Sequence, residues 1–274
     1  MNSYSLVRRF GLAAFLLLAG LALAGLWASS VLADEDAQRK YYMPVVAGAK
    51  LPPPPPPLDC DLPGTNYTTI PIKGDPLVVN AETHPNMNLS ARGYIPVNEG
   101  LGLVQLGSVQ DSRAPQFPAL FGDLRTPAFT TAYQAYKWDD DFTHPIGVET
   151  GWKVTVLGMG TQRGETIYTP DSDYEIAAGG YEYLVMYAGD SDLTLHIGSE
   201  DEFYGYVLHI DGVCTDPDLL ALYRQSDAAG RHNLPVLRGH QAFGKALSGE
   251  IQIAIRDWGG FLDPRSRNDW WQGR

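Results

Sequence analysis

The segment Phe203–Trp271 constrains the fold most, because strand, helix, turn and strand signals follow one another in it. In Glu250–Arg256, isoleucine occupies every second position, which is the period of a β-strand with one buried face. Asp216–Pro217–Asp218 has the acidic N-cap, the early proline and the second carboxylate that begin a helix, and Gly230 is a natural stop. The sequence therefore predicts a strand over 250–256 and one short α-helix over about 216–229.

Further β-type runs precede this segment, separated by turn residues that include many of the 29 glycines and 20 prolines. These runs are Thr68–Ile72, Leu77–Val79, Leu101–Leu106, Trp152–Leu157, Glu165–Tyr168, Tyr181–Tyr187, Leu193–Ile197 and Phe203–Ile210. We expect a mainly β fold, an antiparallel and sandwich-like sheet domain with one short helix. We predict a hairpin at Ser199–Glu202, and a centre near Glu202–Phe203 would make His196 and His209 cross-strand neighbours.

Residues 1–33 have the features of an export signal. Arg8 and Arg9 form a positive start, Phe10–Trp27 is an apolar run, and Val31–Leu32–Ala33 is a small-residue cleavage site. The apolar run is close to the shortest membrane span, so an uncleaved N-terminal anchor is the alternative. The membrane is expected to be a partner only through this segment, if it is not removed.

Residues 34–58 are interpreted as a linker, because Pro52–Pro57 is an unbroken proline run that favours a stiff polyproline II spacer. Residues 59–274 then form a single β-rich domain. The export signal implies that this domain is extracytoplasmic, either secreted or tethered to the cell envelope.

Cys60 and Cys214 are the only cysteines in the chain. In an oxidising compartment an even count favours a disulfide, which would join the start of the domain to its C-terminal half. Two free thiols are the alternative, and two cysteines cannot form a four-ligand zinc site.

The chain is strongly acidic. Two of its 20 Lys and Arg residues, Arg8 and Arg9, precede residue 34, so the rest carries 18 basic against 32 acidic residues, a net charge of −14. This balance repels phosphate backbones, so we expect no nucleic-acid partner.

Two sets of polar residues are candidates for binding. The alternation in 250–256 places Glu250, Gln252 and Arg256 opposite the isoleucines, and we add His209 and His196 from the preceding strands. In Asp111–Phe142, many aromatic residues precede and surround Asp139–Asp140–Asp141; exposed aromatics beside carboxylates could bind a glycan, whereas core packing is the commoner fate of aromatics. The aromatic residues are Phe117, Phe121, Phe129, Tyr133, Tyr136, Trp138 and Phe142.

The C-terminal part resembles the closing segment of lysostaphin-type zinc endopeptidases, in which a Gly-Gln-x-(Ile/Val)-Gly turn precedes a His-x-His-Phe-Glu strand and a terminal Asp-Pro. The matching segments here are Leu237–Gly244, Glu250–Asp257 and Leu262–Pro264. Upstream, Gly205–Ile210 and Ala221–Gln225 resemble the family's Gly-x-x-Val-x-Ile and Tyr-x-His-Leu elements. The chain also resembles exported bacterial proteins of no assigned activity that end in a similar Asp-Pro-Arg-Ser-Arg and Asp-Trp-Trp segment.

The departures from that family concern its chemistry. Its His-x-His pair falls on Glu250 and Gln252, and the histidine of Tyr-x-His-Leu falls on Gln225. Its His-x-x-x-Asp motif has only the loose analogue His144–Glu149, with one residue too many. The resemblance thus implies a scaffold that lacks the zinc and catalytic histidines.

We therefore expect a non-catalytic binding or structural domain, with no cofactor or bound metal. Its candidate partners are a cell-wall glycan such as peptidoglycan, another glycan, or an extracellular protein. The alternative is a metal-dependent cell-wall hydrolase with a non-standard ligand set. That set would be drawn from His144, Glu149, His196, His209 and Glu250.

Overall fold

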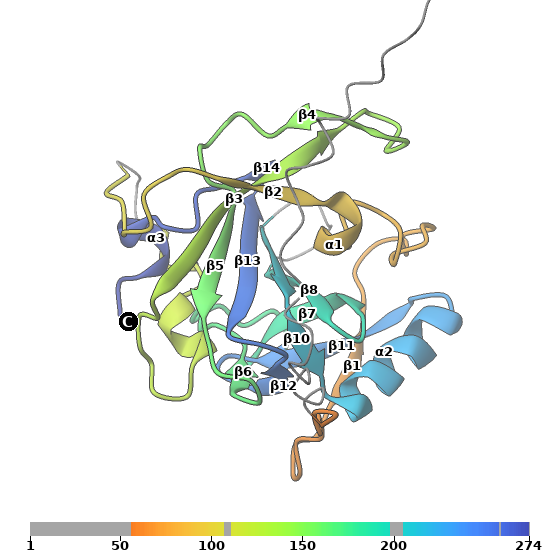
Figure 1. Ribbon diagram of the computed structural model, residues 1–274. Coiled ribbons are helices and arrows are strands. Elements are labelled where there is room, and N and C mark those ends of the chain that lie inside the picture. The colour runs from red at the N-terminus through yellow and green to blue at the C-terminus, as the bar shows by residue number, and fades with distance from the viewer. Residues whose placement is uncertain (1–55, 107–110, 198–204, 258, 274) are drawn as a thin grey trace, which may run out of the picture. The chain divides into compact units, whose positions relative to one another are not determined.

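A computed structural model describes residues 56–106, 111–197, 205–257 and 259–273 (Figure 1). The chain divides into two units, Met1–Pro54 and Pro55–Arg274, and every described residue lies in the second. The Ser199–Glu202 hairpin and the export signal fall outside the described residues.

Most strands belong to one antiparallel sheet of 11 strands, and a second sheet has three strands (Figure 1). The predicted mainly β, antiparallel fold is confirmed. In spatial order the large sheet contains β1 (Thr68–Pro71), β11 (Asn233–Arg238), β7 (Tyr181–Ala188), β8 (Asp192–Ile197), β9 (Tyr206–Asp211), β13 (Glu250–Asp257), β5 (Val156–Gly160), β3 (Phe129–Trp138) and β2 (Tyr94–Val97), with β14 (Gly260–Phe261) beside β13 and β4 (Pro145–Val148) beside β3. The small sheet contains β10 (Val213–Thr215), β12 (Ala242–Ala246) and β6 (Thr166–Tyr168).

The isoleucines of β13 form the centre of the hydrophobic core. Ile251, Ile253 and Ile255 are fully buried, and β9 and β5 supply further buried aliphatic side chains in the same rows. Burying one such side chain stabilises a fold by about 1.5–3 kcal/mol. The alternation in 250–256 therefore fixes which face of β13 packs inward and leaves the other face for polar residues.

The predicted helix is α2 (Pro217–Ala228). The side chain of Asp216 caps its N-terminus by accepting a hydrogen bond from the Asp218 amide at 2.8 Å, and Gly230 follows its end with φ of 88°. α2 packs on β7 and β11. Its position agrees with the predicted range, because every signal used was local.

Three other helical segments are short: α1 (Leu89–Arg92), the 3-10 helix η2 (Phe117–Leu120) and α3 (Arg267–Trp270). Asn88 caps α1 by accepting from the Ala91 amide. The Ser90 hydroxyl donates to Asp211 of β9 at 2.9 Å, which places α1 over the large sheet. In the part of the chain that is described, no helix is long and apolar enough to cross a membrane.

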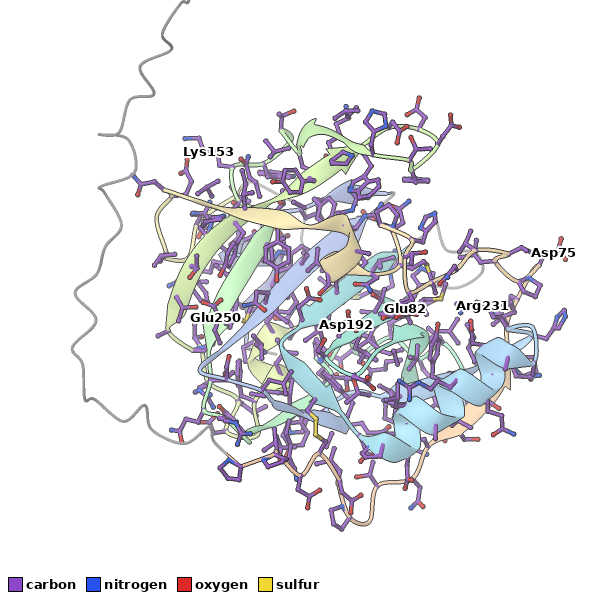
Figure 2. All side chains as sticks on the ribbon, turned by 45° about the vertical axis from the view of Figure 1, so that its right-hand side comes forward. Asp75, Glu82, Lys153, Asp192, Arg231 and Glu250 are labelled. Carbon is purple, nitrogen blue, oxygen red and sulfur yellow. A yellow bond between two sulfur atoms is a disulfide. The ribbon has the colours of Figure 1, made fainter. Side chains whose placement is uncertain are left out.

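Cys60 and Cys214 form a disulfide, which confirms the predicted pair (Figure 2). Their Cα atoms lie 5.7 Å apart across 154 residues of sequence. The bond favours a non-reducing, extracytoplasmic setting.

Several predicted runs differ from the structure. Leu77–Val79 forms no strand, and Leu101–Leu106 contributes only the isolated bridge between Val104 and Ser266. Within the aromatic-rich stretch Asp111–Phe142, for which no strand is predicted, Phe129–Trp138 forms the ten-residue strand β3. Leu237–Gly244, for which the peptidase resemblance implies a turn, contributes to β11 and β12, because partners distant in sequence complete both strands.

Candidate functional site

The five residues predicted to bind a ligand share one face of the large sheet. Arg256 lies opposite Val207, which in turn lies opposite His196. His209 lies opposite Ala254, two residues from Arg256 along β13. Directly paired residues of antiparallel strands point to the same side of the sheet. His196 and His209 therefore share a face with Glu250, Gln252 and Arg256, which occupy even-numbered positions of β13. We call it the polar face; its predicted binding residues are Glu250, Gln252, Arg256, His209 and His196.

The two histidines are not direct cross-strand neighbours. His209 lies opposite Thr194, and His196 lies opposite Val207, so the imidazoles are diagonal neighbours. The expected pairing is therefore wrong by two residues. The hydrophobic alternation fixes which face each strand buries, but a shift of two residues preserves that face, so the pattern cannot set the pairing.

His209 is sealed in the sheet with a fixed tautomer. The single proton of the Thr194 hydroxyl goes to the Met87 carbonyl oxygen at 2.5 Å, because that oxygen can only accept. His209 Nδ1, which is 2.9 Å from the same hydroxyl oxygen, must then donate. Its Nε2 is buried with no hydrogen-bond partner in the described structure. Burial, followed by the charges of Arg256 and Arg92, holds the pKa of His209 well below its ordinary value.

Glu250 is surrounded by hydrogen-bond donors (Figure 2 labels its position). The hydroxyls of Thr130 and Thr131 donate to Oε2, the latter at 3.0 Å, while Tyr133 and Gln252 donate to Oε1 at 2.7 and 2.6 Å. Burial acts to raise the pKa of Glu250, but these hydrogen bonds, led by that of Thr130, lower it overall. Four donors match the four lone-pair positions of a carboxylate, so Glu250 is an ionised structural acceptor.

A pocket of about 640 Å³ lies at the Arg256 end of the polar face. We call it the guanidinium pocket, after Arg92 and Arg256, which both line it. Its volume lies within the range of about 300–1,000 Å³ that is typical of small-molecule sites. The other lining residues are Leu77, Val79, His84, Asn86, Met87, Lys137, Trp138, Asp139, Asp140, Phe142, Glu149, Met186, Thr194, His196, Gly205, Val207 and Gly259.

Arg92, the last residue of α1, is held by four acceptors. Its Nε donates to the Pro85 carbonyl oxygen at 2.9 Å, and its Nη2 donates to Asn86 Oδ1 at 2.5 Å. Its Nη1 donates to the Tyr136 carbonyl oxygen at 2.7 Å and to Glu149 Oε1 at 3.3 Å. Burial lowers the pKa of Arg92 to about 10, although Glu149 acts in the opposite direction, so the group stays charged at neutral pH.

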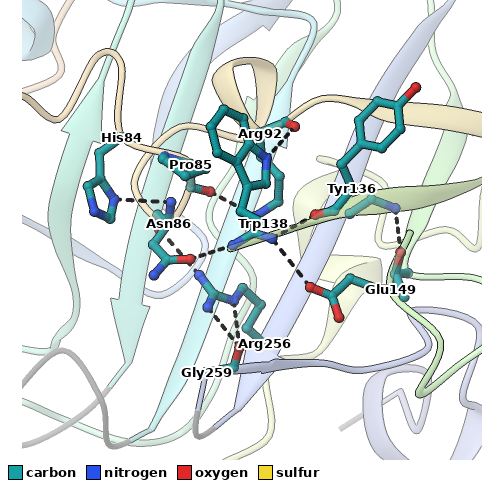
Figure 3. Close-up of polar contacts among 11 residues, drawn as sticks. His84, Pro85, Asn86, Arg92, Tyr136, Trp138, Glu149, Arg256 and Gly259 are labelled. Atoms are coloured by element: carbon teal, nitrogen blue, oxygen red, sulfur yellow. Dashed lines mark hydrogen bonds and ion pairs between the residues drawn. The ribbon is translucent and has the colours of Figure 1, made fainter. Parts of the chain in front are cut away.

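Arg256 is a buried cation whose hydrogen-bond acceptors, among the residues the structure describes, are all carbonyl oxygens. Its Nε and Nη2 donate to the Gly259 carbonyl oxygen at 3.2 and 2.7 Å, and its Nη1 donates to that of Asn86 at 3.4 Å (Figure 3). The side chain is 7% exposed, and no carboxylate of the described residues forms an ion pair with it. Burial, followed by the charge of Arg92, lowers its pKa to about 9. The guanidiniums of Arg256 and Arg92 lie 5.2 and 5.0 Å from the centre of the same Phe261 ring.

Aromatic and acidic side chains form the outer part of the pocket. Trp138 Nε1 donates to the Arg92 carbonyl oxygen at 2.9 Å, which fixes the indole. His84 Nδ1 accepts from the Asn86 amide at 3.2 Å, so its Nε2 carries the proton and is a donor. Burial, followed by the charges of Arg92 and Arg256, lowers the pKa of His84, which keeps the imidazole neutral. Asp140, exposed at the rim, supplies a carboxylate.

The residues of the alternative hydrolase do not form one ligand set. His144 is exposed before β4, Glu149 contacts Arg92, and His196 lines the pocket. His209 is buried in the sheet, and the carboxylate of Glu250 accepts four hydrogen bonds from other residues of the protein. Across the described ranges, no group of three or more His, Cys, Asp or Glu side chains is placed to hold a metal ion.

Of the three positions at which the expected resemblance would place peptidase histidines, two lie together and one lies apart. Gln252 and Glu250 are hydrogen-bonded to each other, whereas Gln225 is exposed on α2. Because α2 packs on β7 and β11, with β8 and β9 between these strands and β13, Gln225 lies apart from the other two.

The Asp-Pro-Arg-Ser-Arg and Asp-Trp-Trp segment, residues 263–271, is largely buried and is held by hydrogen bonds within itself. Arg265 makes a bidentate contact with Asp263, at 3.0 Å through Nε and 2.7 Å through Nη2. The indole nitrogens of Trp270 and Trp271 donate to the carbonyl oxygens of Asp263 and Pro264, each at 2.9 Å. These contacts explain the segment by packing rather than by ligand binding.

Sequence reasoning found Arg256 but not Arg92 or Asn86, and it placed Trp138 and the aspartates in a separate set. Asn86 lies in the turn before α1 and Arg92 ends that helix, and neither position carries a sequence signal that marks it as part of a site. Their approach to Arg256, more than 160 residues away, is set by tertiary packing alone.

We compared the chain with protein-family models, with curated proteins and with solved structures, and none of the three comparisons gives a match.

Proposed function

We propose that this protein is a non-catalytic extracytoplasmic domain, secreted or held at the cell envelope, that binds a unit of peptidoglycan or another glycan in the guanidinium pocket. The observation that carries this proposal is the fixed indole of Trp138 in a pocket whose rim also contains the exposed carboxylate of Asp140. A sugar ring can stack on an aromatic face while its hydroxyls donate to carboxylates. The pocket volume of about 640 Å³ suits a ligand of this size.

The state of the polar face supports a role without catalysis. A general base needs a free lone pair within reach of the substrate. Glu250 uses its lone pairs within the protein, and His209 is 1% exposed. The resemblance to lysostaphin-type peptidases enters the proposal in the same sense, as a related scaffold whose histidine positions hold Glu250 and Gln252.

A binding assay with insoluble peptidoglycan and other glycan polymers tests the proposal. The wild-type protein should be retained, and Trp138→Ala should reduce the affinity about tenfold or more, because stacking area in the pocket is lost. Trp152→Ala is the matched control, since Trp152 is partly exposed but does not line the pocket. Equal retention of the two variants, or no retention of the wild type, would contradict the proposed function. Release of soluble fragments would contradict the absence of catalysis.

A further inference from the structure

We infer that the sugar unit bound in the guanidinium pocket carries a carboxylate, which the Arg256 and Arg92 guanidiniums bind at the inner end of the pocket. This inference rests on the proposed function and names the chemical class of its ligand. It begins from Arg256, because buried charges in proteins are normally paired with an opposite charge. Within the described ranges, the hydrogen-bond partners of Arg256 are the carbonyl oxygens of Gly259 and Asn86, and neither carries an opposite charge.

Unused donors remain on both guanidiniums. An arginine has five N–H groups. The bonds of Arg256 to the described residues use three of them, and those of Arg92 use four. His84 adds the Nε2–H group fixed by its contact with Asn86. Planar guanidinium donors suit the two oxygens of a carboxylate, which they bind in parallel.

The charges in the pocket are arranged by depth. Arg92 and Arg256 are 4% and 7% exposed, and Arg92 forms an ion pair at 3.3 Å with Glu149, which is 26% exposed. At the outer end, Asp139 and Asp140 accompany exposed Lys137. Among the described lining residues, two buried cations and one carboxylate leave one positive charge at the inner end, while Asp139, Asp140 and Lys137 give the rim one net negative charge. A ligand with a carboxylate directed inward and hydroxyl groups directed outward matches both ends.

The size of the uncompensated charge favours a monoanion. One carboxylate balances the single positive charge that Glu149 leaves. A phosphate monoester carries nearly two negative charges at neutral pH and would be repelled by Glu149 at close range. We therefore assign a carboxylated sugar, such as a uronic acid, in preference to a sugar phosphate.

The acidity of the whole chain does not oppose this binding at short range. The formal net charge is −12. Charges beyond about 8 Å are largely screened at physiological ionic strength, whereas buried groups in contact with the ligand are screened much less. The two guanidiniums therefore dominate the field at the inner end of the pocket.

An NMR titration of the full chain with glucuronate and with the methyl ester of glucuronate tests the inference. The ester keeps the sugar ring and removes the negative charge. We expect the ester to bind about tenfold or more weakly, which corresponds to the loss of a charge-assisted hydrogen bond. Arg256→Gln should abolish the preference for the acid. Glu149→Gln should bind glucuronate more tightly than the wild type, because it removes a competing carboxylate. Hexanoate serves as the carboxylate without a sugar ring.

The outcomes separate the inference from the function on which it rests. Equal binding of glucuronate and its ester would overturn the carboxylate assignment and leave the glycan proposal standing. Binding of hexanoate as tight as that of glucuronate would overturn the sugar assignment, and no binding of any probe would overturn both. Thermal unfolding checks that each variant is folded. If Arg256→Gln unfolds, two other variants test the inference. Arg256→Lys keeps the charge but loses the paired donors of the guanidinium, and Glu149→Gln removes the competing carboxylate. An unchanged preference for glucuronate over its ester in both variants would overturn the inference.

Discussion

Removing the Cys60–Cys214 disulfide should destabilise the domain by an amount comparable to much of its total stability. The bond closes a loop across 154 residues of sequence. For a loop of this length, the chain-entropy model gives about 5 kcal/mol at 25 °C, and measured effects reach about 2–5 kcal/mol. Lys245 still donates to the Asp59 and Asp61 carbonyl oxygens, at 2.9 and 2.8 Å. The double variant Cys60→Ser/Cys214→Ser should therefore keep the native geometry and lose about 3–5 kcal/mol through its unfolded state.

Urea denaturation of the wild type and the double variant measures this change. The variant should also show a larger m-value, because its uncrosslinked unfolded chain exposes more surface. Wild-type protein under reducing conditions is the control and should match the variant. A loss of stability below about 1 kcal/mol, or an unchanged wild type after verified reduction, would refute the assignment of the effect to loop closure.

Three further predictions concern packing, pH and metal. Gly244→Ala should cost about 1–3 kcal/mol in the free energy of unfolding, because the added Cβ would lie 2.5 Å from the Cys214 carbonyl oxygen, whereas Gly249→Ala, with its nearest contact at 3.8 Å, should be close to neutral in the same urea experiment. Burial raises the pKa of Asp211 to about 7 in the folded state, so the folded protein binds more protons than the unfolded chain between about pH 4 and 7. The free energy of unfolding should therefore fall by up to about 4 kcal/mol as the pH rises through this window. If the free energy of unfolding of Asp211→Asn falls with pH as steeply as that of the wild type, the assignment to Asp211 is wrong. Elemental analysis of the purified protein should find substoichiometric zinc, and stoichiometric zinc that disappears in His209→Ala would contradict a binding-only domain.

The sequence predicted best those elements whose signals are local. The helix at Pro217–Ala228 follows from its own cap, proline and stop, and the buried face of Glu250–Asp257 follows from three isoleucines. Phe129–Trp138 has aromatic residues on both faces, so it lacks the alternation of apolar and polar residues that indicates a half-buried strand. Strands of this kind are specified by their neighbours, which a single sequence does not reveal.

The candidate site was predictable only in part for the same reason. Arg256 stands out as a charge within an apolar alternation, and Trp138 stands out as an aromatic residue beside carboxylates. The two belong to one pocket because Arg92, from a one-turn helix, contacts the strand that carries Trp138. No spacing in the sequence encodes that contact, and it is the packing of α1 over the sheet that creates it.

The position of β13 has a consequence for the order of folding. β13 pairs with β9 on one side and with β5 on the other, so it joins two halves of the large sheet. Apart from two-residue β14, every other strand precedes it in the chain. A nascent polypeptide that has not yet produced Glu250–Asp257 therefore holds two incomplete half-sheets, and their cooperative assembly must wait for the last long strand.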